Sequence, residues 1–236
     1  MLTIVTANLN NVKYLEKNIL SVQKLKIPFE HIIVDGGSVD GSLEIIAKYP
    51  HIKLLHQTEK TGMYGAIDQG FKAANGDYIT WVNSDDRVIA SGFEAMYKEI
   101  SSETCEFIYS DGYYYYEKDD YKKLSKGRRL GKFFLRHGCI PTMQPSTIYT
   151  KKLYFEVGAL RYDIFRIIGD LDLFVRMANI KDRRFKYISV PSTIFTNRND
   201  SLGNKNSDLY YKELKENNMP IPNLVIRILF RIFKYI

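Results

Sequence analysis

Hydrophobic positions in the first half of the chain alternate between short continuous runs and longer segments with helical spacing. The short runs predict strands at residues 2–6, 31–35, 52–56, 78–82 and 107–110. The segments between them carry apolar residues every three or four positions, which predicts helices at 11–24, 42–49, 63–75 and 91–100. Strands that alternate with helices form right-handed βαβ units, so we expect a mostly parallel sheet. Because the runs are apolar on both faces, helices should cover both sides of the sheet.

The second half of the chain has a less regular pattern. It predicts further strands and helices at 144–149, 151–157, 170–179 and 185–190. The aromatic run 113–116 is typical of a strand with alternating burial, although the same rings could stack on sugars. Residues 197–207 are polar and loop-like, and Pro220 and Pro222 then separate off a last helix at 223–236.

Composition limits the fold, and charge limits the partners. With 236 residues, of which 45% are hydrophobic, the chain can bury the core of one large α/β domain. The net charge of +7 favours anionic partners: nucleic acid, nucleotides or anionic lipid. Basic residues concentrate at 118–136 and at the end of the chain, although ordinary surface lysines account for most of the charge.

The cysteines and the N-terminal residues indicate the cellular compartment in which the protein is expected. Cys105 and Cys139 have no CxxC spacing, which disfavours a zinc site, and two lone thiols suit a reducing cytosol. The first residues lack a basic segment before a long apolar run, so no signal peptide is predicted. No apolar run is long enough for a spanning helix, and we therefore expect a cytoplasmic protein.

Polar residues follow several of the predicted strands at the edge where ligands bind in parallel α/β sheets. These strand ends are Thr6–Asn8, Asp35–Ser38, Asn83–Asp86 and Ser110–Asp111. Together they predict one crevice lined by acids.

Asp35 and the glycines after it form the first candidate site. Glycine lets the backbone approach a ligand closely, and the carboxylate can accept hydrogen bonds from a base or a ribose. The alternative is a helix-capping turn, because Ser38 and Asp40 are good caps.

The turn from Asn83 to Asp86 is the second candidate site. Hard divalent cations bind one or two carboxylates together with substrate phosphates, and this turn follows the buried run Trp81–Val82. A solvated Asp-rich turn is the alternative. No glycine-rich phosphate motif is present, so a metal and basic side chains would have to hold a diphosphate.

Longer motifs resemble a known family. VDGGSVDGSLEII, EKTGMYGAIDQGFKAANGDYITWVNSDD, QPSTIYTKKLYFEVGAL and GDLDLFVRM are similar, in order and spacing over residues 1–180, to the family 2 glycosyltransferases. The resemblance implies the α/β GT-A fold, a Rossmann-like, mostly parallel sheet flanked by helices. A smaller acceptor-side region and a C-terminal amphipathic helix would complete it. The implied domain is 1–210, divided into a nucleotide-sugar half (1–111) and an acceptor-side half (112–210), with a basic tail at 211–236.

The resemblance also implies an activity. It predicts an inverting glycosyltransferase that uses Mn²⁺ or Mg²⁺ and moves a sugar from a nucleoside diphosphate sugar, with UDP favoured. The acceptor would be a saccharide hydroxyl, lipid-linked where the enzyme works at a membrane, in the assembly of surface polysaccharide or another glycan. No nucleic-acid partner is implied. The alternatives are a nucleotidyltransferase and a non-catalytic nucleotide- or RNA-binding module. The segment after the first strand, NLNNVKYLEKN, lacks the glycine-rich basic loop of a nucleotidyltransferase.

Carried over to this sequence, the family pattern assigns the donor side. The residues expected to line the nucleotide pocket are Thr6, Ala7, Asn8, Asp35, Gly62, Tyr64, Asp68, Asn83 and Ser84, with Gly70 nearby. The metal is placed on Asp85, with Asp86 as the second candidate. Asn83 stands where the family often has an aspartate, and an amide adds no charge to a metal.

The same carry-over assigns the acceptor side. Asp170 occupies the position of the catalytic base, with Asp172 as runner-up, although an aspartate that opens a helix is often only an N-cap. Gln144 and Asp172 are expected beside the acceptor. His137 also falls in a plausible acceptor region, and its role stays open.

Two basic segments near the end of the chain have open interpretations. Arg198 and Lys205 could bind the diphosphate from a mobile loop that closes over it. Alternatively, they lie in an ordinary solvated loop. In the tail 223–236, Arg227, Arg231 and Lys234 share one stripe among apolar residues, which suits an anionic membrane surface. The protein would then be peripheral at the inner face of the cytoplasmic membrane. Alternatively, the tail docks on its own domain or on a second subunit of a homodimer.

Overall fold

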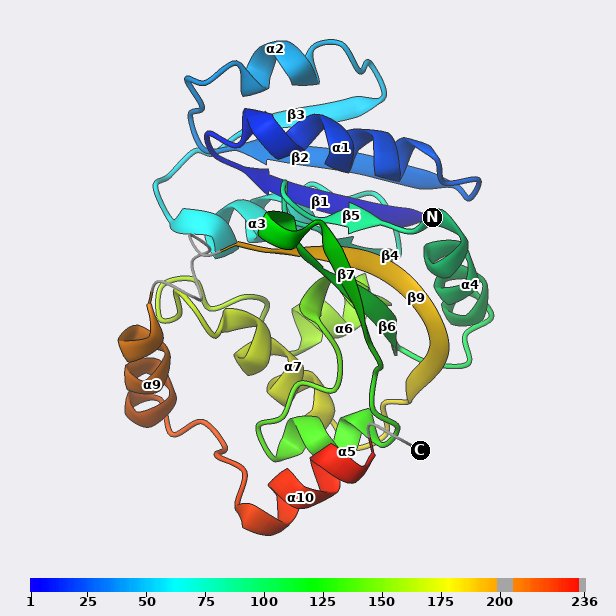
Figure 1. Ribbon diagram of the computed structural model, residues 1–236, viewed down its shortest axis with the longest axis vertical. Helices are drawn as coiled ribbons and strands as arrows, with labels where there is room; N and C mark the ends of the chain where they lie inside the picture. The colour runs from blue at the N-terminus through cyan, green and yellow to red at the C-terminus, as the bar shows by residue number, and fades with distance from the viewer. Residues whose placement is uncertain (199–205, 234–236) are drawn as a thin grey trace.

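The computed structural model describes residues 1–198 and 206–233 and shows a sheet flanked by helices (Figure 1). The strands are β1 (Leu2–Asn8), β2 (Phe29–Asp35), β3 (Ile52–His56), β4 (Tyr78–Trp81), β5 (Arg87–Val88), β6 (Phe107–Tyr116), β7 (Tyr121–Ser125), β8 (Thr147–Thr150) and β9 (Phe185–Asn197). The helices are α1 (Val12–Gln23), α2 (Ser42–Ile46), α3 (Gly62–Lys72), α4 (Ala90–Ser101), α5 (Gly131–Arg136), α6 (Lys151–Glu156), α7 (Gly169–Asn179), α9 (Ser207–Glu216) and α10 (Leu224–Ile232).

The strands are arranged in the order β3-β2-β1-β4-β8-β6-β9-β5, with β7 added beside β6. The pairs β1–β2, β1–β4, β2–β3 and β6–β9 are parallel. β8 runs antiparallel to both β4 and β6, so β4 and β6 point the same way. The predicted mostly parallel sheet is confirmed, and the carboxyl ends of β1, β2, β3 and β4 meet at one edge.

The central strands β1 and β4 are buried along most of their length because helices cover both faces of the sheet. Side chains alternate along β1, so Leu2 and Ile4 pack with α1 and α4 on one face. Val5 packs on the other face, where α3, α6 and α7 meet the sheet in an aromatic-rich core. The largest fully buried rings include Trp81, Phe71 and Phe174. Because helices cover both faces of the sheet, a ligand can approach these strands only at their ends.

One predicted strand end is wrong. The run at 107–110 continues as β6 to Tyr116, because an aromatic strand can pair on both sides, here with β7 and β9. Ser110 and Asp111 therefore lie within a strand, beside a register shift against β9. Asp111 is buried and accepts hydrogen bonds from the Gly127 amide (2.8 Å) and the Tyr187 hydroxyl (2.7 Å). It anchors the chain that leads to α5 and does not belong to the crevice edge.

Other boundaries also differ from expectation. Gln144–Ser146 forms a 3-10 turn before β8, whereas a strand was expected from residue 144. The hairpin strand β7 and helices α5 and α9 were not predicted, and α9 spans the boundary drawn at residue 210. In the described parts of the chain, no helix combines the length and apolarity needed to cross a bilayer.

We expect Gly70→Ala to loosen the packing of α3 on the sheet. A Cβ at Gly70 would lie 2.5 Å from one methyl carbon of Val5 and 3.2 Å from a methyl carbon of Val34, both on rigid strands. Overpacking of this kind costs about 1–3 kcal/mol in the free energy of unfolding. Urea titration would measure the loss, with the exposed helical substitution Lys17→Ala as control. Equal unfolding midpoints for the two variants would contradict this account of the contact.

Candidate active site at the carboxyl ends of the strands

The first part of the site joins the ends of β1 and β2. The Asn8 amide donates to Asp35 Oδ2 (2.9 Å), and the Ser38 hydroxyl donates to the same oxygen (2.6 Å). The amides of Gly37 and Ser38 donate to Asp35 Oδ1 at 2.9 and 2.8 Å. Burial opposes the charge of this carboxylate, but these hydrogen bonds outweigh burial and lower the pKa of Asp35. Asp35 is thus an ionised residue that shapes the loop after β2.

The second part is the turn after β4, and α1 holds it in place. The Asn18 amide donates to the carbonyls of both Asn83 (3.0 Å) and Asp86 (2.9 Å). The Asn11 amide donates to the Ser84 hydroxyl (2.7 Å). The sequence reasoning missed Asn11 and Asn18. A signal was available, because Asn18 is a polar residue on the buried face of an amphipathic helix.

The two aspartates of this turn have different surroundings. The Asp86 side chain is buried, and its Oδ1 accepts a hydrogen bond from the Thr196 amide (2.8 Å). Burial, followed by the charge of Asp85, raises the pKa of Asp86 well above its usual value. Asp85 keeps 17% of its side chain exposed, and its Oδ2 lies 3.3 Å from Arg198 Nε. Asp85 is therefore the carboxylate of the turn that a ligand can reach.

Arg198 comes from the segment after β9 and joins this group. Its Nη1 donates to Asn11 Oδ1 (3.1 Å), and its guanidinium lies 4.8 Å from the centre of the Tyr14 ring. The structure thus places the predicted diphosphate-binding arginine beside the predicted metal-binding aspartate. Lys205, proposed for the same loop, lies outside the described residues.

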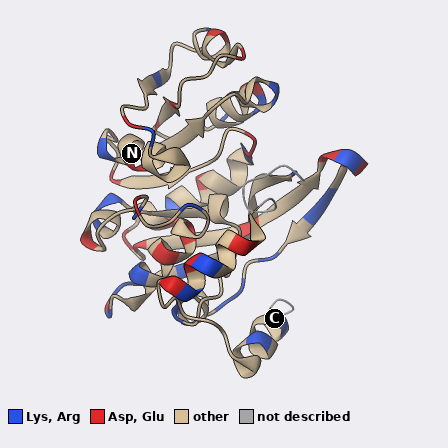
Figure 2. Cartoon of the chain, turned by 90° about the vertical axis from the view of Figure 1, so that its left-hand side faces the viewer, with Lys and Arg blue, Asp and Glu red and all other residues tan. Residues whose placement is uncertain are grey.

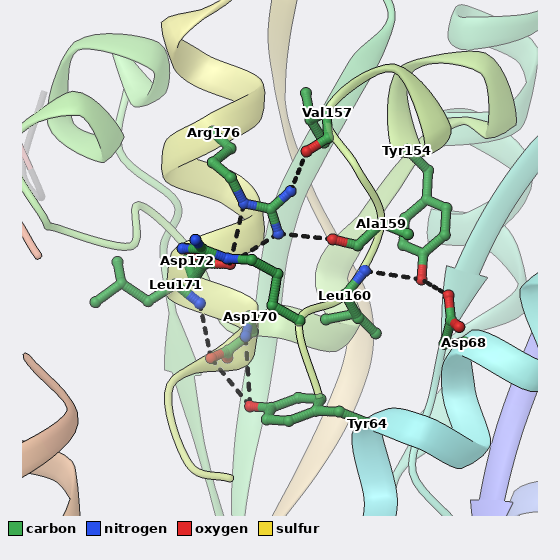
Figure 3. Close-up of polar contacts among 11 residues, drawn as sticks. Tyr64, Asp68, Tyr154, Val157, Ala159, Leu160, Asp170, Leu171, Asp172 and Arg176 are labelled. Atoms are coloured by element: carbon green, nitrogen blue, oxygen red, sulfur yellow. Dashed lines mark hydrogen bonds and ion pairs between the residues drawn. The ribbon is translucent and has the colours of Figure 1, made fainter. Parts of the chain in front are cut away.

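Asp170 opens α7 and meets the first turn of α3 (Figure 3). Asp170 Oδ1 accepts a hydrogen bond from the Leu171 amide (2.8 Å) and lies 3.3 Å from the Tyr64 hydroxyl. The same hydroxyl lies 2.9 Å from the Ile167 carbonyl. Burial is the main influence and raises the pKa of Asp170 to about 6, although hydrogen bonds from Leu171 and Tyr64 oppose it. A carboxyl with this pKa can accept a proton near neutral pH.

Contacts with α3 and β4 place the start of α7 at the same edge as the strand ends. α3 begins after β3, and its first turn touches Asp170 through Tyr64. The Trp81 ring at the end of β4 packs against Phe174, one turn into α7 (centroids 6.2 Å apart). The Gln144 amide donates to the Trp81 carbonyl (3.0 Å), which places Gln144 beside the same strand end. Asp35, Asp85 and Asp170 thus come from β2, β4 and α7 at one edge.

Asp172 has a structural environment. Its carboxylate is 1% exposed and pairs with the guanidinium groups of both Arg161 and Arg176. Arg176 also donates to the carbonyls of Val157 and Ala159 (Figure 3). This network connects α7 to the segment after α6. The Asp172 carboxylate, which was expected beside the acceptor, is instead paired with the two arginines.

The remaining predicted residues divide between the edge and the interior. Thr6 is buried beneath the edge with its hydroxyl near His31 Nε2 (3.1 Å), whereas Ala7 is only partly buried. Gly62 has a φ of +74° and would hold a Cβ 3.1 Å from a guanidinium nitrogen of Arg166. Asp68 turns away from the edge, towards the Tyr154 hydroxyl (2.6 Å).

Two further residues lie away from the strand ends. Gly70 packs on the sheet core. His137 lies just after α5 with its Nδ1 2.9 Å from the Phe133 carbonyl.

A divalent cation is the group that the acidic turn could hold. In the described ranges 1–198 and 206–233, no three His, Cys, Asp or Glu side chains form a metal cluster. The turn nevertheless contains two buried oxygens with no hydrogen-bond partner, Asn83 Oδ1 and Asp86 Oδ2, beside the partly exposed Asp85. Oxygen atoms of this kind fit a hard cation that takes its other ligands from phosphates.

Comparison with known proteins identifies the family. The sequence profile of glycosyl transferase family 2 matches residues 3–161, which is more than half of the chain. The chain therefore belongs to glycosyl transferase family 2, as its motifs predicted. Among curated relatives, glycosyltransferase GlyG of Streptococcus pneumoniae is 32% identical over 124 residues, which cover 50% of this chain and 41% of GlyG. The match thus spans less than half of that relative.

Solved structures confirm the predicted GT-A fold. Staphylococcus aureus TarS (residues 1–349) superposes with a TM-score of 0.71 at 16% identity, covering 91% of this chain and 63% of that one. Mannosyltransferase PcManGT of Pyrobaculum calidifontis, solved with GDP-Man and Mn²⁺, gives a TM-score of 0.66 at 14% identity. That match covers 92% of this chain and 64% of PcManGT. TarS has also been solved with UDP-GlcNAc.

We expect Asp172→Asn to destabilise the fold, because it leaves two arginines without their carboxylate. Removing one partner of a buried pair costs about 3–5 kcal/mol, and the 40% exposure of Arg161 favours the lower end. Chemical denaturation should show this loss, whereas Glu216→Gln in the exposed pair with Lys212 should change the unfolding free energy by less than about 0.5 kcal/mol. Native stability combined with lost activity would instead assign Asp172 to the chemistry.

Proposed function

We propose that this protein is an inverting glycosyltransferase that moves a sugar from a nucleoside diphosphate sugar to a saccharide hydroxyl. The observation that carries the proposal is that two groups of side chains lie at the same edge of the sheet. One is the acidic turn with Asp85 and Arg198, and the other is Asp170, whose pKa is raised to about 6. Family membership supports this activity, and a UDP sugar is favoured because TarS, which shares the fold, has been solved with one.

The leaving diphosphate would be held at the turn after β4. Asp85 is the proposed ligand of Mn²⁺ or Mg²⁺, and the bound cation would neutralise the charge that develops on the diphosphate. Arg198, already within reach of Asp85, would donate to the phosphate oxygens. The orphaned oxygen of Asp86 keeps that residue as the second candidate ligand.

The nucleoside would bind beside β1 and β2. Asp35 keeps the Gly36–Ser38 loop in shape, and a hydrogen bond from the base or ribose would replace that of the Ser38 hydroxyl. Ser84 and Asn83 would approach the ribose from the neighbouring turn. Tyr64 acts at the other end of the site, because its hydroxyl contacts Asp170.

Asp170 would act as the base on the acceptor side. Its Oδ1 is engaged by the Leu171 amide and lies near Tyr64, which leaves Oδ2 to accept the proton of the acceptor hydroxyl. The acceptor oxygen attacks the anomeric carbon as the bond from that carbon to the diphosphate oxygen breaks. In-line displacement inverts the configuration. Gln144, hydrogen-bonded to the end of β4, would orient the acceptor.

A lipid-linked acceptor would bring the protein to an anionic membrane. We propose that the tail from residue 223 makes this contact, since the described part of α10 bears Arg227 and Arg231 beside exposed apolar side chains. Lys234 of the same predicted stripe lies outside the described residues. The saccharide would then be extended at the membrane surface, as in the assembly of a surface polysaccharide.

Product formation tests the function. The protein is incubated with Mn²⁺ and a panel of nucleotide sugars and saccharide acceptors, and both free nucleoside diphosphate and glycosylated acceptor are measured. We expect both products with at least one donor. Retention of the donor without release would indicate a binding module, and transfer of the nucleoside monophosphate with release of sugar 1-phosphate would indicate nucleotidyl transfer.

We expect transfer to fall as the pH drops through about 6, because the base must be deprotonated and the pKa of Asp170 is about 6. Asp170→Asn should bind donor yet lose roughly 10²–10⁴-fold in transfer rate. Tyr64→Phe removes a hydrogen bond that lowers this pKa, so the acidic limb of kcat/KM should move to higher pH. Tyr154→Phe, which removes a similarly buried hydroxyl bonded to Asp68, is the control and should leave the limb in place.

We expect the two aspartates of the turn to differ when each is changed to asparagine. Asp85→Asn should reduce metal-dependent transfer roughly 10²-fold or more, because it removes the accessible negative charge at the diphosphate. Asp86→Asn keeps an oxygen for the Thr196 amide and should stay within about ten-fold of the wild type. Titration of the transfer rate with Mn²⁺ would distinguish them, and the reverse order would move the metal to Asp86.

A further inference from the structure

The basic segment at 118–136 has no role in the proposed transfer reaction. No Asp or Glu occurs between Asp120 and Glu156, nor after Glu216, and the fold brings these two acid-free stretches together. α5 lies against α10 (Figure 1), with the Phe134 ring 5.0 Å from Phe230 and 5.7 Å from Phe233 between centroids. The two helices therefore form one surface, which we call the α5–α10 face.

α10 presents apolar side chains in two directions. Phe230 and Phe233 attach the helix to α5, and Ile226, one turn before Phe230, is buried. The opposite side has Leu224, Val225, Ile228 and Ile232, which are 72%, 63%, 49% and 47% exposed. The attachment to α5 thus leaves an apolar stripe uncovered in the described chain. One side of α10 thus docks on its own domain, and membrane binding by the other side stays a prediction.

Cations flank the open stripe. Arg227 and Arg231 lie on the remaining side of α10 and are exposed, and Figure 2 shows basic but no acidic residues on this helix. On the adjoining segment, the Arg128 guanidinium covers the Phe230 ring at 4.5 Å. Phe133 of α5 is also partly exposed (39%). The face combines apolar and positively charged groups without an acidic residue on either helix.

A pocket of about 610 Å³ lies between α5 and β9, and Phe133 of the α5–α10 face is one of its lining residues. It is lined by Arg129, Lys132, Arg136, Tyr187 and Ser189 among others, and no carboxylate lines it. Lys132 Nζ donates to the carbonyls of Lys181 (2.9 Å) and Arg183 (2.7 Å), and Arg136 Nε donates to that of Ala178 (2.8 Å). Carbonyls fix these side chains without cancelling their charge. Burial and the charge of Arg136 lower the pKa of Lys132, as expected where cations are crowded.

We propose that the α5–α10 face docks on an anionic phospholipid membrane, with the open stripe of α10 in the headgroup boundary and a lipid phosphate in the α5 pocket. This inference rests on the proposed membrane contact of the tail and extends it to α5. A membrane supplies both an apolar phase and a high density of phosphate. A second copy of the chain would cover the stripe but would bring its own arginines against these. Charge complementarity therefore favours lipid.

Vesicle flotation of the full chain tests the proposal, first with phosphatidylcholine and then with phosphatidylcholine mixed with phosphatidylglycerol. We expect binding to the anionic vesicles that salt weakens. Arg129→Gln combined with Arg136→Gln should weaken this binding roughly five-fold per charge removed. Ile228→Ser combined with Ile232→Ser should weaken it by on the order of ten-fold or more. The matched controls Lys24→Gln with Lys152→Gln, and Leu20→Ser on α1, should bind as the wild type does.

Three outcomes would overturn the proposal. The first is equal flotation of all variants. The second is a concentration-dependent dimer that Ile228→Ser with Ile232→Ser converts to monomer, which would assign the stripe to a second copy. The third is a pocket that binds inorganic phosphate or glycerol phosphate while the arginine variants float normally, which would assign it to a free phosphate compound. Release of nucleoside diphosphate from the soluble donor is measured in parallel, so that loss of vesicle binding alone leaves the transfer proposal intact.

Discussion

A single buried amide holds the turn on which the donor side depends. Asn18 lies on the buried side of α1. Its side-chain amide donates hydrogen bonds to two carbonyls of the turn after β4, those of Asn83 and Asp86. β9 closes the turn from the other side, through the Thr196 amide and hydroxyl. With its backbone fixed at both ends, the turn can bury Asp86 and still present Asp85 to the surface. Two adjacent and chemically identical residues thereby acquire different accessibility, and burial raises the pKa of Asp86 well above its usual value.

The position of Asp170, the proposed base, depends on the contact between α3 and α7. The Tyr64 hydroxyl reaches Asp170, and the Arg166 guanidinium donates to the Thr61 carbonyl (3.1 Å). Farther along α3, Asp68 meets Tyr154 of α6. The helix that follows the nucleotide-side strands is thus attached to the helices of the second half at several points. Displacement of α3 would move the first turn of α7, so the packing of Gly70 on the sheet also affects the position of Asp170.

Local patterns in the sequence predicted the parallel half of the fold well, because buried parallel strands and amphipathic helices carry a strong periodic signal. They failed where distant partners decide the structure. β7 is an exposed, lysine-rich strand with no burial pattern, and β6 extends past Asp111 because two strands pair with it. The motifs selected the acidic turn and Asp170, whose roles stay predictions. They could not show that Asp172 pairs with Arg161, or that Tyr64 turns towards Asp170, because these contacts depend on tertiary packing.

The contact between Arg198 and Asp85 has a consequence for the order of ligand arrival. The Arg198 guanidinium lies 3.3 Å from this carboxylate, so a free cation would have to displace an internal positive charge to reach it. A diphosphate changes the balance, because it gives the arginine a new anionic partner as it frees the carboxylate for the cation. Metal and nucleotide should therefore enter as a complex, and the affinity for metal alone should be weak. In the proposed site, the ion pair would keep the two opposite charges in position until the diphosphate binds Arg198 and the cation binds Asp85.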